Sequence, residues 1–205
     1  MKFKVWLGLG ALTILLALGT ALVLIFIQSQ AASPMTTQAL PQVGGAQTAR
    51  QAYALLLQQW APGWAADTQL VSVSASLLKA EGQSLGWSFQ VYSPSRQKLA
   101  VVLVSPDRVW VLREKSIPYS QRTITDSAWR LDSEALLAQW WERSGVMLWS
   151  QPQVDSLYVH LRSEKDGALV WQISMLDKNG DLIGYWGMSA ADGAVLYEDI
   201  PGGRP

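Results

Sequence analysis

The sequence predicts an α+β protein that follows a membrane-spanning helix. Three observations lead to this fold class. Residues 5–27 form a stretch of 23 residues without a charge. After residue 47 the chain contains two similar halves, and each half has one amphipathic helical pattern followed by several strand patterns. A helix followed by an antiparallel meander is typical of folds in which the helix packs on one face of a sheet.

The uncharged stretch at the N-terminus is long enough to cross a membrane. As a helix it spans about 34 Å, against a hydrocarbon core of about 30 Å. Lys2 and Lys4 precede it and the next basic residue is Arg50, so we expect a cytoplasmic N-terminus and extracytoplasmic domains. A cleaved signal peptide is the alternative, because Ser29-Gln30-Ala31 is a tolerable cleavage site. The apolar region of a signal peptide is about 7 to 15 residues, which favours an uncleaved single-pass anchor.

Composition excludes several classes of site. The chain has 16 basic and 16 acidic residues, of which 14 and 16 follow the anchor, so no basic patch for nucleic acid is expected. The absence of Cys excludes disulfides and thiolate sites, and a single His excludes multi-His metal sites. We expect no cofactor and no metal. Residues 28–47 are uncharged and rich in Gln, Ala, Ser, Thr, Pro and Gly, which is typical of a flexible linker.

The first half begins with an amphipathic helix, whose apolar face is formed by Ala49, Ala52, Tyr53, Leu56 and Trp60. Pro62 and Gly63 are predicted to end it. Alternating or continuous apolar patterns then predict strands over residues 71–77, 87–91, 99–104 and 109–112.

The second half repeats this order. Leu136, Leu137, Trp140 and Trp141 form the apolar face of a helix that Asp132 or Ser133 can cap and Gly145 can end. Strands are predicted over residues 157–161, 169–175, 182–188 and 194–197, with a hairpin at Asn179-Gly180 and a turn at Asp192-Gly193. The halves align at an offset of about 84 residues, WSFQV from Trp87 with WQISM from Trp171. A half of this size has a marginal core, so we expect the two halves to pack together.

The second half, over about residues 132–199, resembles a PepSY domain. The resemblance lies in WQISMLDKNG (171–180) and MSAADGAVL (188–196). Residues 48–114 are similar to a degenerate copy, with Arg108 where the family has Gly and Pro94-Ser95 where it has Asn-Gly. The resemblance implies tandem PepSY/cystatin-like repeats outside the cytoplasm that hold or inhibit peptidases or regulate envelope processes, and it supplies no catalytic residues. The expected organisation is anchor (1–27), linker (28–47), first repeat (48–116), connector (117–131), second repeat (132–200) and tail (201–205).

Few residues indicate a chemical site. His160 takes an outward position between Tyr158 and Arg162 on an alternating strand, which favours a surface residue over a catalytic one. Asp177, Asn179 and Asp181 resemble part of a calcium loop, but no closing Glu follows, and a polar hairpin explains them.

The eleven Trp residues divide by position. Five lie on apolar stripes and are expected in the core: Trp60, Trp87, Trp140, Trp141 and Trp171. Trp64, Trp129 and Trp149 lie in loops or at element ends and are the candidates for partner binding, the alternative being that they pack between the repeats.

The sequence therefore predicts a membrane-anchored extracytoplasmic binding or regulatory protein without enzymatic activity. The expected partner is a protein, such as a peptidase or a subunit of a membrane complex. The alternative is a module that binds cell-wall glycan through exposed Trp side chains.

Overall fold

The computed structural model describes residues 37–39, 45–77, 82–145 and 149–199. The chain divides into two units, residues 1–34 and 35–205, and the fold described below belongs to the second unit. Among the described residues, no helix is long and apolar enough to span a membrane. The predicted anchor at residues 5–27 lies outside the described residues.

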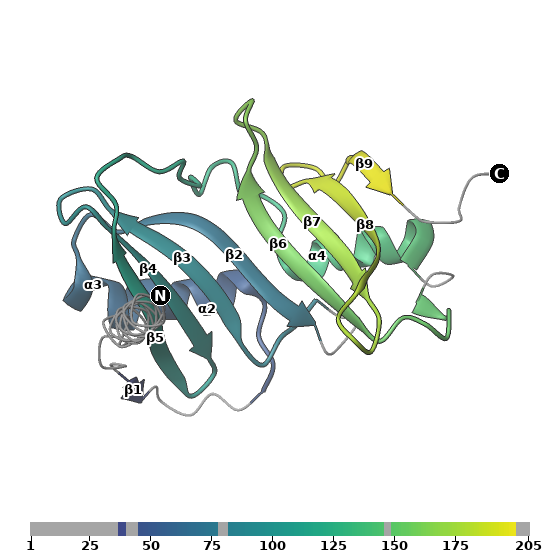
Figure 1. The fold of residues 1–205 in the computed structure, drawn as a ribbon, viewed down its shortest axis with the longest axis horizontal. Helices are drawn as coiled ribbons and strands as arrows, with labels where there is room; N and C mark the ends of the chain where they lie inside the picture. Colours follow the sequence, from purple (N-terminus) through teal and green to yellow (C-terminus); the bar gives the residue numbers. More distant parts are fainter. Residues whose placement is uncertain (1–36, 40–44, 78–81, 146–148, 200–205) are drawn as a thin grey trace, which may run out of the picture. The chain divides into compact units, whose positions relative to one another are not determined.

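The second unit is built on one antiparallel sheet, in the order β1-β5-β4-β3-β2-β6-β7-β8-β9 (Figure 1). Together with the helices described next, this sheet confirms the α+β class. The strands are β1 (Thr37–Ala39), β2 (Gln69–Leu77), β3 (Trp87–Ser93), β4 (Lys98–Ser105), β5 (Arg108–Ser116), β6 (Ser156–Ser163), β7 (Leu169–Leu176), β8 (Leu182–Ser189) and β9 (Val195–Asp199).

Each half contributes one helical segment before its strands. The first comprises α2 (Ala49–Leu55), the π-helical turn η1 (Leu56–Trp60) and α3 (Ala61–Trp64), and the second comprises α4 (Ser133–Trp140) and the π-helical turn η2 (Trp141–Gly145). The prediction that Pro62 and Gly63 end the first helix is wrong, because helical structure continues to Trp64. Pro62 lies in the first turn of α3, where a missing N–H breaks no helical hydrogen bond.

The helices cover one face of the sheet and share a single core with both halves. In Figure 1 the helices α2 and α4 lie behind the strands. Alternate side chains of each strand point to these helices, and one cluster of buried side chains extends from Ala49 in α2 to Met188 in β8. The rings of Trp87 and Trp171 meet edge to face, with 6.4 Å between their centroids.

The first strands of the two halves pair with each other. Ala75 in β2 lies opposite Val159 in β6, and the two positions are equivalent under the repeat offset of 84 residues. Two indole hydrogen bonds obey the same offset: Trp87 Nε1 donates to the carbonyl of Gln47 at 2.8 Å, and Trp171 Nε1 donates to the carbonyl of Leu131 at 2.9 Å. The halves are therefore related by a local two-fold axis that passes between Ala75 and Val159.

The N-termini of α2 and α4 meet beside this axis. Asp132 is the N-cap of α4, and its Oδ1 accepts a hydrogen bond from the backbone N–H of Ser133. The same oxygen accepts from the N–H of Arg50 at 3.1 Å, and Ser133 Oγ accepts from the N–H of Ala49 at 3.0 Å. The start of the second helix thus supplies acceptors for the otherwise unpaired donors of the first.

Candidate functional site

The three Trp candidates for partner binding do not form a common exposed surface. Trp129 is 0% exposed and donates its indole N–H to the carbonyl of Leu131 at 3.0 Å. Trp64 is 9% exposed and stacks on Trp60 with 5.1 Å between ring centroids. Both rings belong to the buried core, so neither offers an exposed contact surface.

Trp149 is half-buried, and its ring centroid lies 6.1 Å from that of Trp141. Of the three candidates, only the half-buried ring of Trp149 could therefore stack on a glycan. The structure thus favours the alternative interpretation, in which these side chains pack within the fold.

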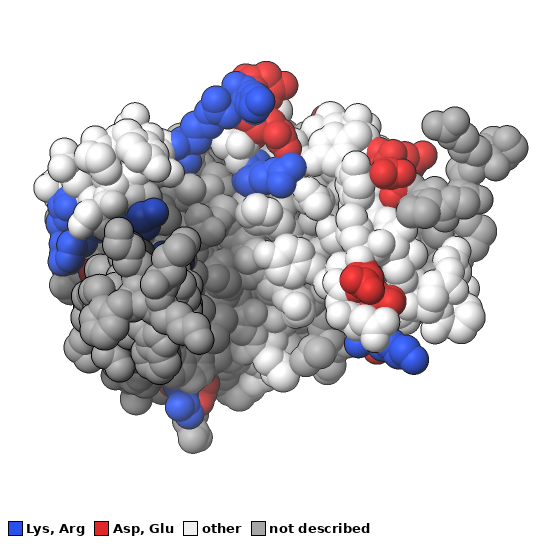
Figure 2. Space-filling view, viewed as in Figure 1, with Lys and Arg blue, Asp and Glu red and all other residues white. Residues whose placement is uncertain are grey.

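The face of the sheet opposite α2 and α4 is the first candidate surface. Part of it is visible in Figure 2, where the described residues are mostly uncharged and the charged side chains form a few small groups. Serines of β2 lie at its centre: Ser74 is opposite His160 of β6, and Ser72 is opposite Arg162. Polar side chains from both halves therefore meet on this face, at the seam between β2 and β6.

A hollow of about 340 Å³ opens at this seam, and we call it the seam hollow. β2, β3, β6 and the connector (residues 117–131) all contribute to it. The residues around it are Val71, Ser72, Gln90, Gln121, Arg122, His160, Arg162 and Ser163.

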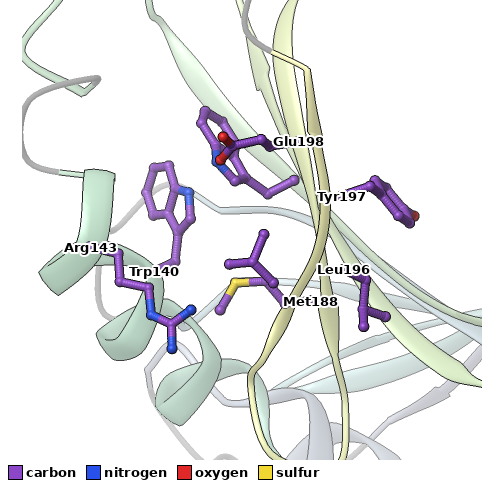
Figure 3. Close-up of a pocket in the computed structure, with 8 residues that line it drawn as sticks. Trp140, Arg143, Met188, Leu196, Tyr197 and Glu198 are labelled. Carbon is purple, nitrogen blue, oxygen red and sulfur yellow. The ribbon is translucent and has the colours of Figure 1, made fainter.

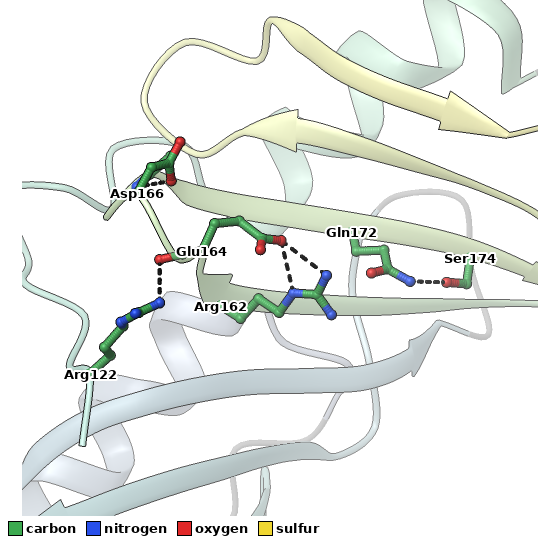
Figure 4. Close-up of polar contacts among 7 residues, drawn as sticks. Arg122, Arg162, Glu164, Asp166, Gln172 and Ser174 are labelled. Atoms are coloured by element: carbon green, nitrogen blue, oxygen red, sulfur yellow. Dashed lines mark hydrogen bonds and ion pairs between the residues drawn. The ribbon is translucent and has the colours of Figure 1, made fainter. Parts of the chain in front are cut away.

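Two arginines of the seam hollow share one acidic residue. Arg162 directs Nε and Nη2 to Glu164 Oε1, at 3.1 and 3.0 Å (Figure 4). Arg122 donates Nη1 to the backbone carbonyl of Glu164 at 2.8 Å. The carboxylate of Glu164 thus pairs with Arg162 of β6, and its backbone carbonyl binds Arg122 of the connector.

His160 lies beside these arginines and is half-buried. Burial lowers its pKa, the positive charge of Arg162 lowers it further, and Glu164 opposes both effects. The sequence predicts a surface residue. The structure places it on the outward face of β6, as the alternation predicts, where Gln121 and Arg122 of the connector line the same hollow.

The second candidate is a cleft of about 440 Å³ at the C-terminal edge of the sheet, which we call the edge cleft (Figure 3). Trp140 and Arg143 line it from the helical side, and Trp186, Met188 and residues 195–198 line it from β8 and β9. The indole Nε1 atoms of Trp140 and Trp186 are buried and have no hydrogen-bond partner. A buried unpaired donor costs about 1–3 kcal/mol, so an acceptor group at this position is favourable.

The strand next to the edge cleft, β9, ends the sheet. The opposite edge is covered where β1 pairs with β5, whereas β9 pairs only with β8 among the described strands. Val195 is 37% exposed and Leu196 49% exposed. An unpaired edge with exposed apolar side chains is a template for another extended segment.

The residues that resemble a calcium loop form a hairpin turn. Asp177 Oδ1 accepts hydrogen bonds from the backbone N–H groups of Asn179 and Asp181, at 2.7 and 2.8 Å. These bonds, the one from Asp181 first, lower the pKa of Asp177. Within the described ranges, no group of three or more His, Cys, Asp or Glu side chains is arranged to hold a metal ion.

Sequence reasoning missed most residues of both sites. Strand alternation predicts that His160 and Arg162 share a face, which is a signal for two of the eight residues around the seam hollow. Arg122 lies in a connector without periodicity, and Arg143 lies beyond the predicted apolar helix face. No pattern in the sequence therefore indicates that either residue belongs to a site. Comparison of the chain with protein-family models, curated proteins and solved structures found no match.

Proposed function

We propose that this chain is a membrane-tethered, extracytoplasmic binding or regulatory protein without enzymatic activity, whose partner is another protein such as a peptidase or a membrane-complex subunit. The uncharged segment at residues 5–27 and the preceding Lys2 and Lys4 support the tether. The resemblance of residues 132–199 to PepSY domains supports recognition of a protein.

The main structural support for a protein partner is the unpaired edge of β9 and the cleft beside it. β2 and β6 pair with each other across the seam, so the inner edges of the two halves are already occupied. The outer edge of β9 has no strand partner within the described residues. An extended segment of a partner can add to such an edge through main-chain hydrogen bonds, while adjacent pockets receive its side chains. The edge cleft, lined by Val195 and Leu196, is placed to receive them.

Site-specific photo-cross-linking in native membranes tests this contact. The full chain carries the cross-linking amino acid at Leu196, or at Leu112 on β5 as a control with similar exposure, 49% against 41%. We expect one discrete cross-linked protein from position 196 that is weaker or absent from position 112. Introducing Leu196→Lys into a chain probed at Val195 should reduce that product, whereas Leu112→Lys should not. Equal products from both positions, or none from either, would contradict the proposed contact.

The tether has a separate test. We expect the full-length chain to remain in the membrane fraction after a carbonate wash, because an apolar helix in the bilayer is not extracted by high pH. Release of a shortened chain would instead support cleavage near Ser29 to Ala31.

A further inference from the structure

We propose that the seam hollow binds a phosphate group through Arg122, Arg162 and His160. The ligand class is a small phosphate monoester or diester. This site lies on the opposite face of the sheet from the edge cleft, and the inference does not depend on the protein partner proposed above.

The balance of charges is the first argument. Arg122 and Arg162 bring two permanent positive charges to the hollow, and Glu164 is the single acidic side chain bonded to either of them in the described part of the chain. A guanidinium carries five N–H donors. The bonds with Glu164 use one donor of Arg122 and two of Arg162, and the hydroxyl of Tyr197 also interacts with Arg162. Each guanidinium keeps further N–H donors for a ligand. Paired guanidinium donors match the oxygens of a phosphate.

The shape and the neutral lining are the second argument. About 340 Å³ lies at the lower end of the range for small-molecule pockets. Ser72 is 7% exposed on the lining strand β2, and Gln90, Gln121 and Ser163 add amide and hydroxyl donors around the rim. A phosphate monoester needs several donors at once, and this hollow brings them from four separate segments of the chain.

His160 makes the binding depend on pH. Arg162 and Glu164 are the charged groups that shift the pKa of His160, Arg122 lines the same hollow, and the ring of Tyr158 lies 6.4 Å from the imidazole. The strands beside β6 place the uncharged Ser74 and Gln172 opposite it. Burial lowers the pKa of the imidazole. A bound phosphate stabilises the imidazolium form and raises this pKa, so affinity for phosphate should increase as the pH falls.

Nuclear magnetic resonance of the single histidine tests the proposal in the full chain. The sequence has one His, so isotope labelling of histidine gives one imidazole signal. Inorganic phosphate, added at constant ionic strength to the full chain in micelles of a non-ionic detergent without phosphate groups, should shift this signal saturably and raise the pKa of His160. Chloride at the same ionic strength should not. An equal response to chloride would mean an adventitious ion only and would overturn the proposal.

Substitutions separate a binding role from a structural one. Arg162→Gln and Arg122→Gln should each weaken phosphate binding about tenfold or more, because each removes a charge-assisted contact. Arg143→Gln, on the other face of the sheet, should leave it unchanged. Glu164→Gln should strengthen binding, because its carboxylate competes with the ligand for Arg162. Loss of binding in Glu164→Gln together with retention in both arginine variants would refute the assignment.

The source of the phosphate group is distinguished by the membrane used. A His160 shift on moving the chain from the detergent micelles into nanodiscs of the anionic lipid phosphatidylglycerol, without added phosphate, would identify a lipid headgroup. A shift with glycerol phosphate but not with the anionic lipid would identify a soluble ligand. No response to inorganic phosphate, glycerol phosphate or anionic lipid would overturn the site.

Discussion

Ser133 connects the two halves of the protein, and its replacement by Ala should lower the free energy of unfolding. Ser133 Oγ accepts a hydrogen bond from the backbone N–H of Ala49 at 3.0 Å, and both residues are 0% exposed. Without the hydroxyl, the first N–H of α2 is buried and unpaired. Leaving one buried donor unsatisfied costs about 1–3 kcal/mol, which is a substantial part of a typical stability of about 5–15 kcal/mol.

Urea unfolding of the full chain in mild detergent, followed by Trp fluorescence, measures this change. We expect the midpoint to fall for Ser133→Ala with an unchanged slope, because the folded and unfolded states keep their surface areas. Asp132→Ala should also destabilise, because Asp132 Oδ1 accepts from the N–H groups of Ser133 and Arg50. The matched control is Ser127→Ala, at an exposed position of the connector.

Two results would refute this reasoning. A loss below about 0.5 kcal/mol for Ser133→Ala, within the range of surface substitutions, would mean that water or a local shift satisfies the Ala49 N–H. A loss equal to that of Ser127→Ala would mean that the contact between the helix N-termini does not contribute to stability.

Two further predictions concern one strand edge and one aromatic side chain. Gly187→Ala should destabilise the protein by about 1–3 kcal/mol, because the new methyl group would overlap the ring of Tyr197 across the β8–β9 pair. Hydrogen exchange should become faster at β9, whereas Gly167→Ala, which has open space around it but a positive φ of 88°, should leave β9 unaffected. Burial, aided by Asp126, raises the pKa of Tyr53 from 10.0 to about 12. The unfolded chain therefore loses this proton first, and stability should fall as the pH rises from 10 to 12. Tyr53→Phe should reduce that fall in alkaline denaturation experiments, and an identical pH profile would show that Tyr53 is not shielded.

The sequence predicted the secondary structure well where local patterns were strong. Each predicted strand lies within one of β2 to β9 or differs from it by a residue at an end, because alternation reports directly which side chains face the core. The hairpin at Asn179-Gly180 and the turn at Asp192-Gly193 also form, with Gly180 and Gly193 at positive φ. The prediction that Pro62 ends the first helix was wrong because a π-helical turn precedes this residue, and a new helical turn begins just before it.

Function-related details were harder to predict because they depend on contacts between distant segments. Trp129 follows no periodic pattern, yet it is buried between Tyr53 and Trp171. The seam hollow joins Ser72, Arg122 and Arg162, and no local signal places these residues together. The exposed edge at β9 likewise depends on which strands pair.

Local sequence patterns were enough to predict the α+β class, the two similar halves and most strand positions, because each of these depends on the order of neighbouring residues. They narrowed the cap of the second helix to Asp132 or Ser133, and the structure shows that it is Asp132. Only the folded chain shows that β2 and β6 pair about a local two-fold axis, so that two small halves without disulfides share one sheet and one core. The halves pair because each alone leaves an inner strand edge and part of an apolar face uncovered, and the other half covers both. This pairing creates the seam hollow and leaves β9 at the end of the sheet.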